Sequence, residues 1–224
     1  MLAPHRASSC LVALLLLLGG CASRPVNPPI GKLDADRAYS FQRAGRTSGS
    51  QQNFVILAFS GGGTRAAAFS YGVLEALRRI EVTNPAGQTG RLLDEVDAIT
   101  GVSGGSFTAL AYGLYGDKLF DDYEQRFLKR NVQGELIRRA LSPFNWGALT
   151  ATGWGRSEMA ADLYDEILFN GATFADLWRA GGPNVAVTTT DIATGARIVF
   201  TPVNFDILCA DLGAIRLSRA ACST

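Results

Sequence analysis

A serine flanked by glycines is the residue in this chain best placed to act as a nucleophile. Gly101-x-Ser103-x-Gly105 lies within "ITGVSGGSF", with an apolar run before it and another after it. Glycines at these positions allow a tight strand-to-helix turn that exposes the serine hydroxyl, and the N-terminus of the following helix favours developing negative charge. The pattern predicts acyl transfer with Ser103 as the nucleophile. The alternative is a structural turn that contains a small residue.

A triple-glycine loop is the second group of residues with a chemical use. "GGGTR" separates the apolar run 53–60 from the amphipathic segment 66–80, so its backbone N–H groups are exposed and can bind a phosphate or an oxyanion. Phosphate binding is disfavoured because the loop has no Walker lysine-serine pair and Ala66 replaces the last glycine of a dinucleotide fingerprint. A tight turn without a ligand is the other alternative. Beside a serine elbow, we interpret the loop as an oxyanion hole formed by Gly61, Gly62 and Gly63.

The usual base for a serine nucleophile is a histidine, and the chain contains one, His5. His5 lies in a basic N-terminus that is followed by the apolar run 11–18. This run is shorter than the roughly 20 residues that a helix needs to span a bilayer, and its length is typical of a signal peptide. Small residues directly before Cys21 resemble a bacterial lipoprotein signal. We therefore expect residues 1–20 to be cleaved, Cys21 to be lipidated and the mature chain to lack histidine. An ordinary signal peptide with a chance cysteine is the alternative.

The two glycine motifs are positioned by strand-to-helix units. Each follows a run apolar enough for a strand buried on both faces and precedes a helical pattern, which predicts an α/β domain with a mainly parallel sheet. The segment 121–141 resembles an amphipathic helix interrupted near Gly134, and "SPFNWGALTATGWG" resembles an aromatic loop. The expected strands are 53–60, the end of 92–101, 184–191 and 196–203, the last two as a hairpin or as neighbours. The expected helices are 66–80, 107–116 and 157–169.

Length and composition indicate one folded domain behind an N-terminal extension. Of the 224 residues 47% are hydrophobic, and 21 basic against 20 acidic side chains leave no basic surface for nucleic acid. We expect a tether over 21–52 and the folded domain over 53–224. Cys209 and Cys222 remain in the mature chain, either as a disulfide or as free thiols. Without a Cys/His cluster or a cluster of carboxylates, we expect no metal and no cofactor.

Together, "GGGTRAAAFSYGVLEAL" and "ITGVSGGS" resemble the patatin-like phospholipase family in order and spacing, over about residues 54–224. The resemblance implies a three-layer α/β/α fold and a phospholipase or lysophospholipase that hydrolyses membrane lipid esters. It also implies a Ser-Asp dyad, in which a carboxylate takes the proton directly, so a chain without histidine is no obstacle. The implied roles are nucleophile for Ser103, oxyanion donors for Gly61, Gly62 and Gly63, and support of their loop for Arg65.

Two departures from the family pattern affect these expectations. Ser60 stands where the family usually has an aspartate that is not catalytic, and the "DGG" or "DGA" motif that carries the dyad aspartate does not occur. "LSRAACST" resembles the segment shortly before that motif, so we expect a C-terminally incomplete domain with its aspartate beyond residue 224. Asp191 follows a predicted strand, but we interpret it as the turn residue that opens "DIATG" and do not assign it as the base.

Three functional hypotheses follow. The first is a membrane-anchored lipid acyl hydrolase; the second is an inactive lipoprotein of the same fold that serves as a binding or scaffold domain. The third is a triad esterase whose histidine lies beyond residue 224. Sequence downstream of that residue distinguishes the three. Because Ala22 follows the cysteine where the retention signal has aspartate, we expect an exported lipoprotein in the outer membrane, facing the periplasm.

Overall fold

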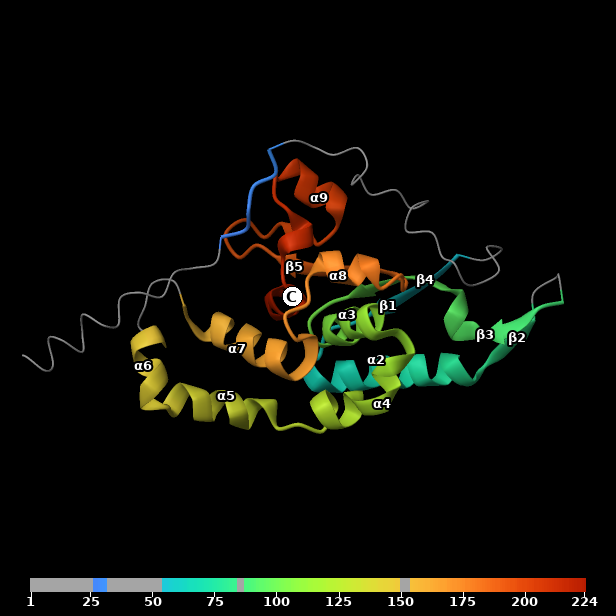
Figure 1. Ribbon diagram of the computed structural model, residues 1–224, viewed down its shortest axis with the longest axis horizontal. Helices are drawn as coiled ribbons and strands as arrows, with labels where there is room; N and C mark the ends of the chain where they lie inside the picture. Colours follow the sequence, from blue (N-terminus) through green and yellow to red (C-terminus); the bar gives the residue numbers. More distant parts are fainter. Residues whose placement is uncertain (1–25, 32–53, 84–86, 150–153) are drawn as a thin grey trace, which may run out of the picture. The chain divides into compact units, whose positions relative to one another are not determined.

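The computed structural model describes residues 26–31, 54–83, 87–149 and 154–224 (Figure 1). The predicted signal peptide, Cys21 and most of the predicted tether lie outside the described residues. The chain divides into two compact units. Of the described residues, the larger unit contains 27–31, 54–83, 87–130 and 164–224, and the smaller contains Val26, 131–149 and 154–163.

The larger unit is built on a four-stranded sheet with the strand order β1-β4-β5-β6. The first three strands are parallel, and β6 pairs antiparallel with the end of β5, so the predicted mainly parallel sheet and the predicted hairpin are both confirmed. Helices pack on the sheet (Figure 1), which makes this an α/β fold. The strands are β1 (Val55–Phe59), β4 (Val96–Gly101), β5 (Asn184–Thr190) and β6 (Arg197–Val199).

Two helices follow directly from the strands β1 and β4. Helix α2 (Gly63–Arg79) buries Ala67, Tyr71 and Leu74, which recur at helical spacing, and its other side stays exposed. Helix α3 (Gly104–Tyr115) is buried along most of its length. Its contact with the sheet is close because a Cβ at Gly113 would lie 2.7 Å from Cγ2 of Val185 on β5. The helix that begins at the predicted elbow is therefore fixed in the core.

Buried polar contacts join α3 to its neighbours. The Thr108 hydroxyl donates to the carbonyl of Ala67 on α2 over 2.9 Å and lies 2.9 Å from the Tyr123 hydroxyl. Burial raises the pKa of Tyr123 far above its ordinary value, and burial raises the pKa of Tyr112 to about 12. These phenols are therefore neutral at physiological pH.

The remaining elements of the larger unit are short. They are β2 (Glu81–Thr83) and β3 (Thr89–Arg91), three 3₁₀ turns (Leu92–Glu95, Gly116–Lys118 and Leu212–Ala214), α4 (Leu119–Tyr123), two π-helical turns (Glu124–Leu128 and Asp165–Phe169), α8 (Phe174–Arg179), α9 (Pro202–Ile207) and α10 (Leu217–Ser223). The smaller unit contains α5 (Val132–Leu141), α6 (Pro143–Leu149) and all but the last residue of α7 (Arg156–Tyr164).

Two local expectations differ from the structure. The break expected near Gly134 lies before α5, because the Asn131 side chain accepts a hydrogen bond from the Gly134 N–H over 2.9 Å and places that glycine in the first turn. The first half of the segment expected to be an aromatic loop forms α6, with Pro143 as its first residue, and residues 150–153 of that segment lie outside the described residues. The helix expected over 157–169 is confirmed: α7 begins one residue earlier and continues into the π-helical turn to Phe169, and Glu158 accepts the Gly155 N–H at its start over 3.0 Å.

The described part of the predicted tether pairs with the larger unit. Pro29 forms an isolated antiparallel bridge with Ala210, and the Ile30 N–H donates to the carbonyl of Cys209 over 3.0 Å. Residues 26–31 are therefore attached to the segment after α9, whereas a simple extended tether was expected. Cys209 is exposed and Cys222 is half-buried, and no disulfide joins them, so of the two alternatives the disulfide is not formed.

Candidate active site

Ser103 occupies a strained turn between β4 and α3. Its φ of 49° and ψ of −122° lie outside the regions that non-glycine residues ordinarily adopt, at a cost of about 1–3 kcal/mol. Hydrogen bonds on both sides fix this conformation. The Val102 N–H donates to the carbonyl of Phe59 over 3.1 Å, and the Ser106 N–H donates to the carbonyl of Ser103 over 2.9 Å. A strained turn of this kind between a strand and a helix is what a nucleophile elbow requires, and the role of Ser103 as a nucleophile stays a prediction.

The flanking glycines are required because neighbouring backbone leaves no room for a side chain. A Cβ at Gly101 would lie 2.7 Å from the Cα of Ser106, and one at Gly105 would lie 2.7 Å from the Cβ of Phe59. Gly104, which was not predicted as a site residue, is equally constrained, because a Cβ there would collide with the carbonyl oxygen of Gly63. The only signal for that glycine was its place in the doubled "GG" after the serine.

The triple-glycine loop lies against this elbow. Gly62 precedes α2 with a φ of 142°, and Gly63 begins the helix with a φ of 63°, so both adopt backbone angles that favour glycine. A Cβ at Gly61 would lie 3.3 Å from the Cβ of Ser103. All three glycines are exposed. The first N–H groups of a helix have no partners within the helix, so this loop can offer donors to an oxyanion beside the serine.

The sheet register explains why the two loops meet. Phe59 at the end of β1 pairs with Gly101 at the end of β4, and the strands are parallel, so both chains leave the sheet at the same edge. Each chain then enters a helix at once. The N-termini of α2 and α3 lie side by side there, and their dipoles favour negative charge that develops near Ser103. The structure thus brings together the predicted nucleophile and the predicted oxyanion loop.

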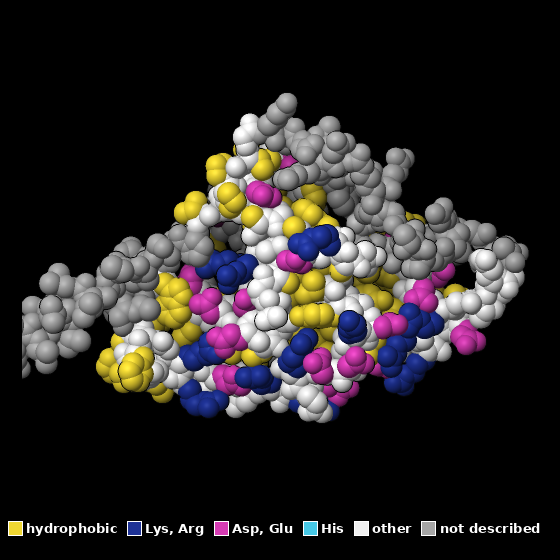
Figure 2. Space-filling model, in the orientation of Figure 1, with side chains coloured by type: hydrophobic (Ala, Val, Ile, Leu, Met, Phe, Trp, Pro, Cys, Tyr) yellow, Lys and Arg dark blue, Asp and Glu magenta, His cyan; other side chains and the backbone are white. Residues whose placement is uncertain are grey.

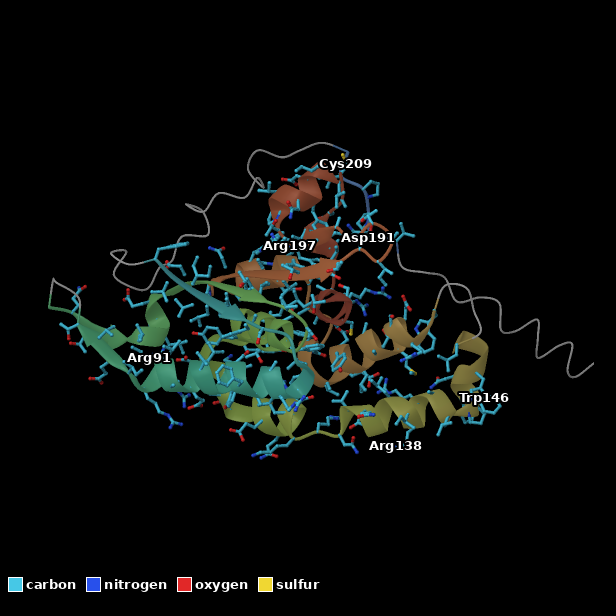
Figure 3. The ribbon with its side chains drawn as sticks, turned by 180° about the vertical axis from the view of Figure 1, so that it is seen from behind. Arg91, Arg138, Trp146, Asp191, Arg197 and Cys209 are labelled. Atoms are coloured by element: carbon cyan, nitrogen blue, oxygen red, sulfur yellow. The ribbon has the colours of Figure 1, made fainter. Side chains whose placement is uncertain are left out.

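No hydrogen bond joins the Ser103 side chain to a base within the described residues. Asp191, the carboxylate considered from the sequence, lies in the turn between β5 and β6 (Figure 3). It accepts the Thr194 hydroxyl over 2.5 Å and the Ala193 N–H over 3.0 Å, and these hydrogen bonds lower its pKa. Val187 on β5 pairs with Gly101 at the end of β4. Asp191 follows Val187 by four residues, which corresponds to about 13 Å of extended chain between Asp191 and the level of Gly101. Asp191 therefore closes the turn that opens "DIATG", as predicted from the sequence.

Arg65 is exposed on the first turn of α2. Within the described residues its guanidinium forms no hydrogen bond or ion pair with the glycine loop, so support of that loop by Arg65 stays a prediction. The described residues also contain no group of three or more His, Cys, Asp or Glu side chains that could hold a metal ion. None of the helices in the described ranges is long and apolar enough to cross a membrane.

Comparison with known proteins agrees with this geometry. The family model described as patatin-like phospholipase matches residues 57–224, a range that includes both glycine motifs and the whole sheet after the first residues of β1. No curated protein matches the chain.

Proposed function

The chain belongs to the patatin-like phospholipase family, and on that premise we propose that it is a serine acyl hydrolase that cleaves phospholipid or lysophospholipid esters with Ser103 as its nucleophile. The observation that carries this proposal is the contact between the strained Ser103 and the Gly61–Gly63 loop. A turn of purely structural use has no need of a strained serine next to exposed N–H donors.

The proposed reaction has two acyl-transfer steps. The Ser103 hydroxyl oxygen attacks the ester carbonyl carbon while a carboxylate takes its proton, and N–H groups of the triple-glycine loop stabilise the resulting oxyanion. Collapse of this intermediate breaks the bond to the alcohol oxygen, which receives the proton from the carboxylic acid. A water molecule, deprotonated by the same carboxylate, then hydrolyses the acyl-serine and releases the fatty acid.

We place the carboxylate on an aspartate of a "DGG" or "DGA" motif beyond residue 224. The support is indirect: Asp191 is committed to its own turn, and the family resemblance implies the dyad. A general base contributes about 10²–10⁴ to such a rate, so its presence determines whether the serine turns over. The absence of a base next to Ser103 among the described residues is also what favours the second candidate, an inactive membrane-attached binding or scaffold domain.

Membrane attachment through a lipid on Cys21, in the outer membrane and facing the periplasm, completes the proposal. It rests on the sequence before residue 22, which lies outside the described residues. An anchor of this kind would hold the site close to the membrane and so raise the effective concentration of the lipid substrate at the site.

Hydrolysis measured on lipid substrates tests the proposed function. The protein, produced with all the sequence that its gene encodes, should release fatty acid from phosphatidylcholine or lysophosphatidylcholine vesicles, and Ser103→Ala should reduce release to background. Ser106→Ala is the matched control, because that hydroxyl is buried in α3, three residues after Ser103, and should be dispensable. Equal release by the Ser103→Ala protein would refute the nucleophile, and no release by the wild type would favour the scaffold.

A further inference from the structure

The end of α5 and the whole of α6 present large apolar side chains to solvent. Phe144 is 97% exposed, Leu141 70% and Trp146 57%, and Ile137 lies one turn before Leu141 on the same side of α5. We call these four residues the α5–α6 corner. Figure 2 shows hydrophobic side chains gathered over α6 and the adjoining end of α5. Helix α5 has no buried residue, so this face does not serve as a core.

Hydrogen bonds hold the corner in shape. The Asn145 side-chain amide donates to the carbonyl of Arg139 over 2.8 Å, and the Asn145 N–H donates to the carbonyl of Ser142 over 3.0 Å. The Ser142 N–H in turn donates to the backbone carbonyl of Arg139 over 3.3 Å, and this hydrogen bond lies at the end of α5. The turn between the helices is therefore fixed, and Phe144 beside it is almost fully exposed.

Basic side chains accompany the aromatic ones. Arg138 is exposed on α5, Arg139 follows it, and Figure 3 shows Arg138 and Trp146 on these neighbouring helices. Aromatic and aliphatic groups that point outward beside arginines are typical of surfaces that enter the headgroup region of a bilayer, where the rings contact acyl chains and guanidinium groups contact phosphates.

We propose that the α5–α6 corner docks on a phospholipid bilayer, with Phe144 and Trp146 inserted among the lipids and Arg138 directed to their phosphates. The choice of a lipid as the partner rests in part on the proposed function. A second copy of the chain fits less well. The four side chains expose on the order of 500 Å², whereas a stable protein interface buries about 800 Å² on each partner. Insertion into lipid has no such minimum, because each apolar side chain contributes separately.

Tryptophan fluorescence on vesicles tests the docking directly. Two proteins would be compared, both with Ser103→Ala so that no lipid is consumed. In the first protein the substitutions Trp154→Phe and Trp178→Phe leave Trp146 as the one tryptophan of the three in the sequence. The other keeps Trp178, a 47% exposed residue of α8 in the other unit, through Trp146→Phe and Trp154→Phe. Any N-terminal anchor acts equally on both proteins.

We expect vesicles of phosphatidylcholine and phosphatidylglycerol to shift Trp146 emission to the blue. Bromine atoms on the acyl chains should quench Trp146 at least twice as strongly as Trp178. Unchanged Trp146 emission, or equal quenching of the two residues, would overturn the proposal. So would a blue shift that depends on protein concentration and needs no vesicles, because it would indicate self-association. Since the readout needs no catalysis, its failure is distinct from failure of the proposed function.

A pair of substitutions provides a second measurement. Phe144→Ser should weaken the vesicle partition constant by about tenfold, because it removes one large apolar side chain from the lipid contact. Ile192→Ser is the matched control, since Ile192 is 100% exposed in the turn between β5 and β6. Equal partition constants for the two variants would contradict docking through the corner.

Discussion

Replacing Gly104 by alanine perturbs the contact between the elbow and the triple-glycine loop without touching the chemistry of either. The added methyl would collide with the carbonyl oxygen of Gly63 and would lie 2.7 Å from its carbonyl carbon. The atoms in the way are backbone atoms, so no rotamer change relieves the collision. Either α3 or the loop must move, by about 1 Å, to restore ordinary contact distances.

The structure allows the size of the effect to be estimated. Overpacking of a close contact costs about 1–3 kcal/mol of stability, which a folded domain can tolerate. The cost to catalysis is larger, since loss of one oxyanion donor reduces the rate by about 10²–10³ and a misplacement of about 1 Å can cost about 10²-fold. We therefore expect kcat/KM for Gly104→Ala to fall at least a hundredfold while the protein remains folded.

Ester hydrolysis and urea unfolding, measured on the same preparations, check this expectation. The matched control is Gly72→Ala, because Gly72 lies in α2 with open space around its Cβ position. Alanine there should stabilise the helix by about 0.5–1 kcal/mol and leave kcat/KM unchanged. If the Gly104→Ala protein is folded and as active as the wild type, the contact between the two loops does not position the catalytic groups.

The other predictions concern single side chains. Ser106→Ala removes a buried hydroxyl that lacks a hydrogen-bond partner among the described residues, so the Tm should stay equal or rise; a fall of several degrees would reveal a partner. Asp191→Asn should leave the rate unchanged, and a loss of activity would make this carboxylate the base. The pKa of Asp191 is lowered on folding, so the stability that its carboxylate contributes should be present above about pH 4 and lost as the pH falls below that value. The free energy of unfolding of the asparagine variant should lack this part of the pH dependence. Cys21→Ala should abolish incorporation of a radiolabelled fatty acid, and an unlabelled wild type would refute lipidation.

Local patterns were enough to predict the elements around the site. The apolar runs before Gly61 and Gly101 are long enough for buried strands, and each ends at a glycine turn that only a strand-to-helix junction explains. The parallel pairing of β1 and β4 is what a helix between two strands leads to, because the helix carries the chain back so that the second strand runs in the same direction as the first. The family model confirms the resemblance that these two motifs carry.

Features that depend on distant or competing partners were missed. A side chain is excluded at Gly104 because the backbone of Gly63, about 40 positions earlier in the chain, lies against it. The residues around Gly104 in the sequence do not indicate this contact. The break before α5 was misplaced because glycine is a helix breaker, whereas the Asn131 cap determines where the helix begins. The β2–β3 hairpin was missed because its strands have three residues each and no apolar alternation.

Mapping the site of a covalent inhibitor tests the central claim most directly. The protein with all of its encoded sequence would be treated with a fluorophosphonate, digested and analysed by mass spectrometry. We predict one phosphonylated residue, Ser103, and no adduct in the Ser103→Ala variant. An adduct on another serine together with full ester hydrolysis by Ser103→Ala would contradict the assignment of the nucleophile.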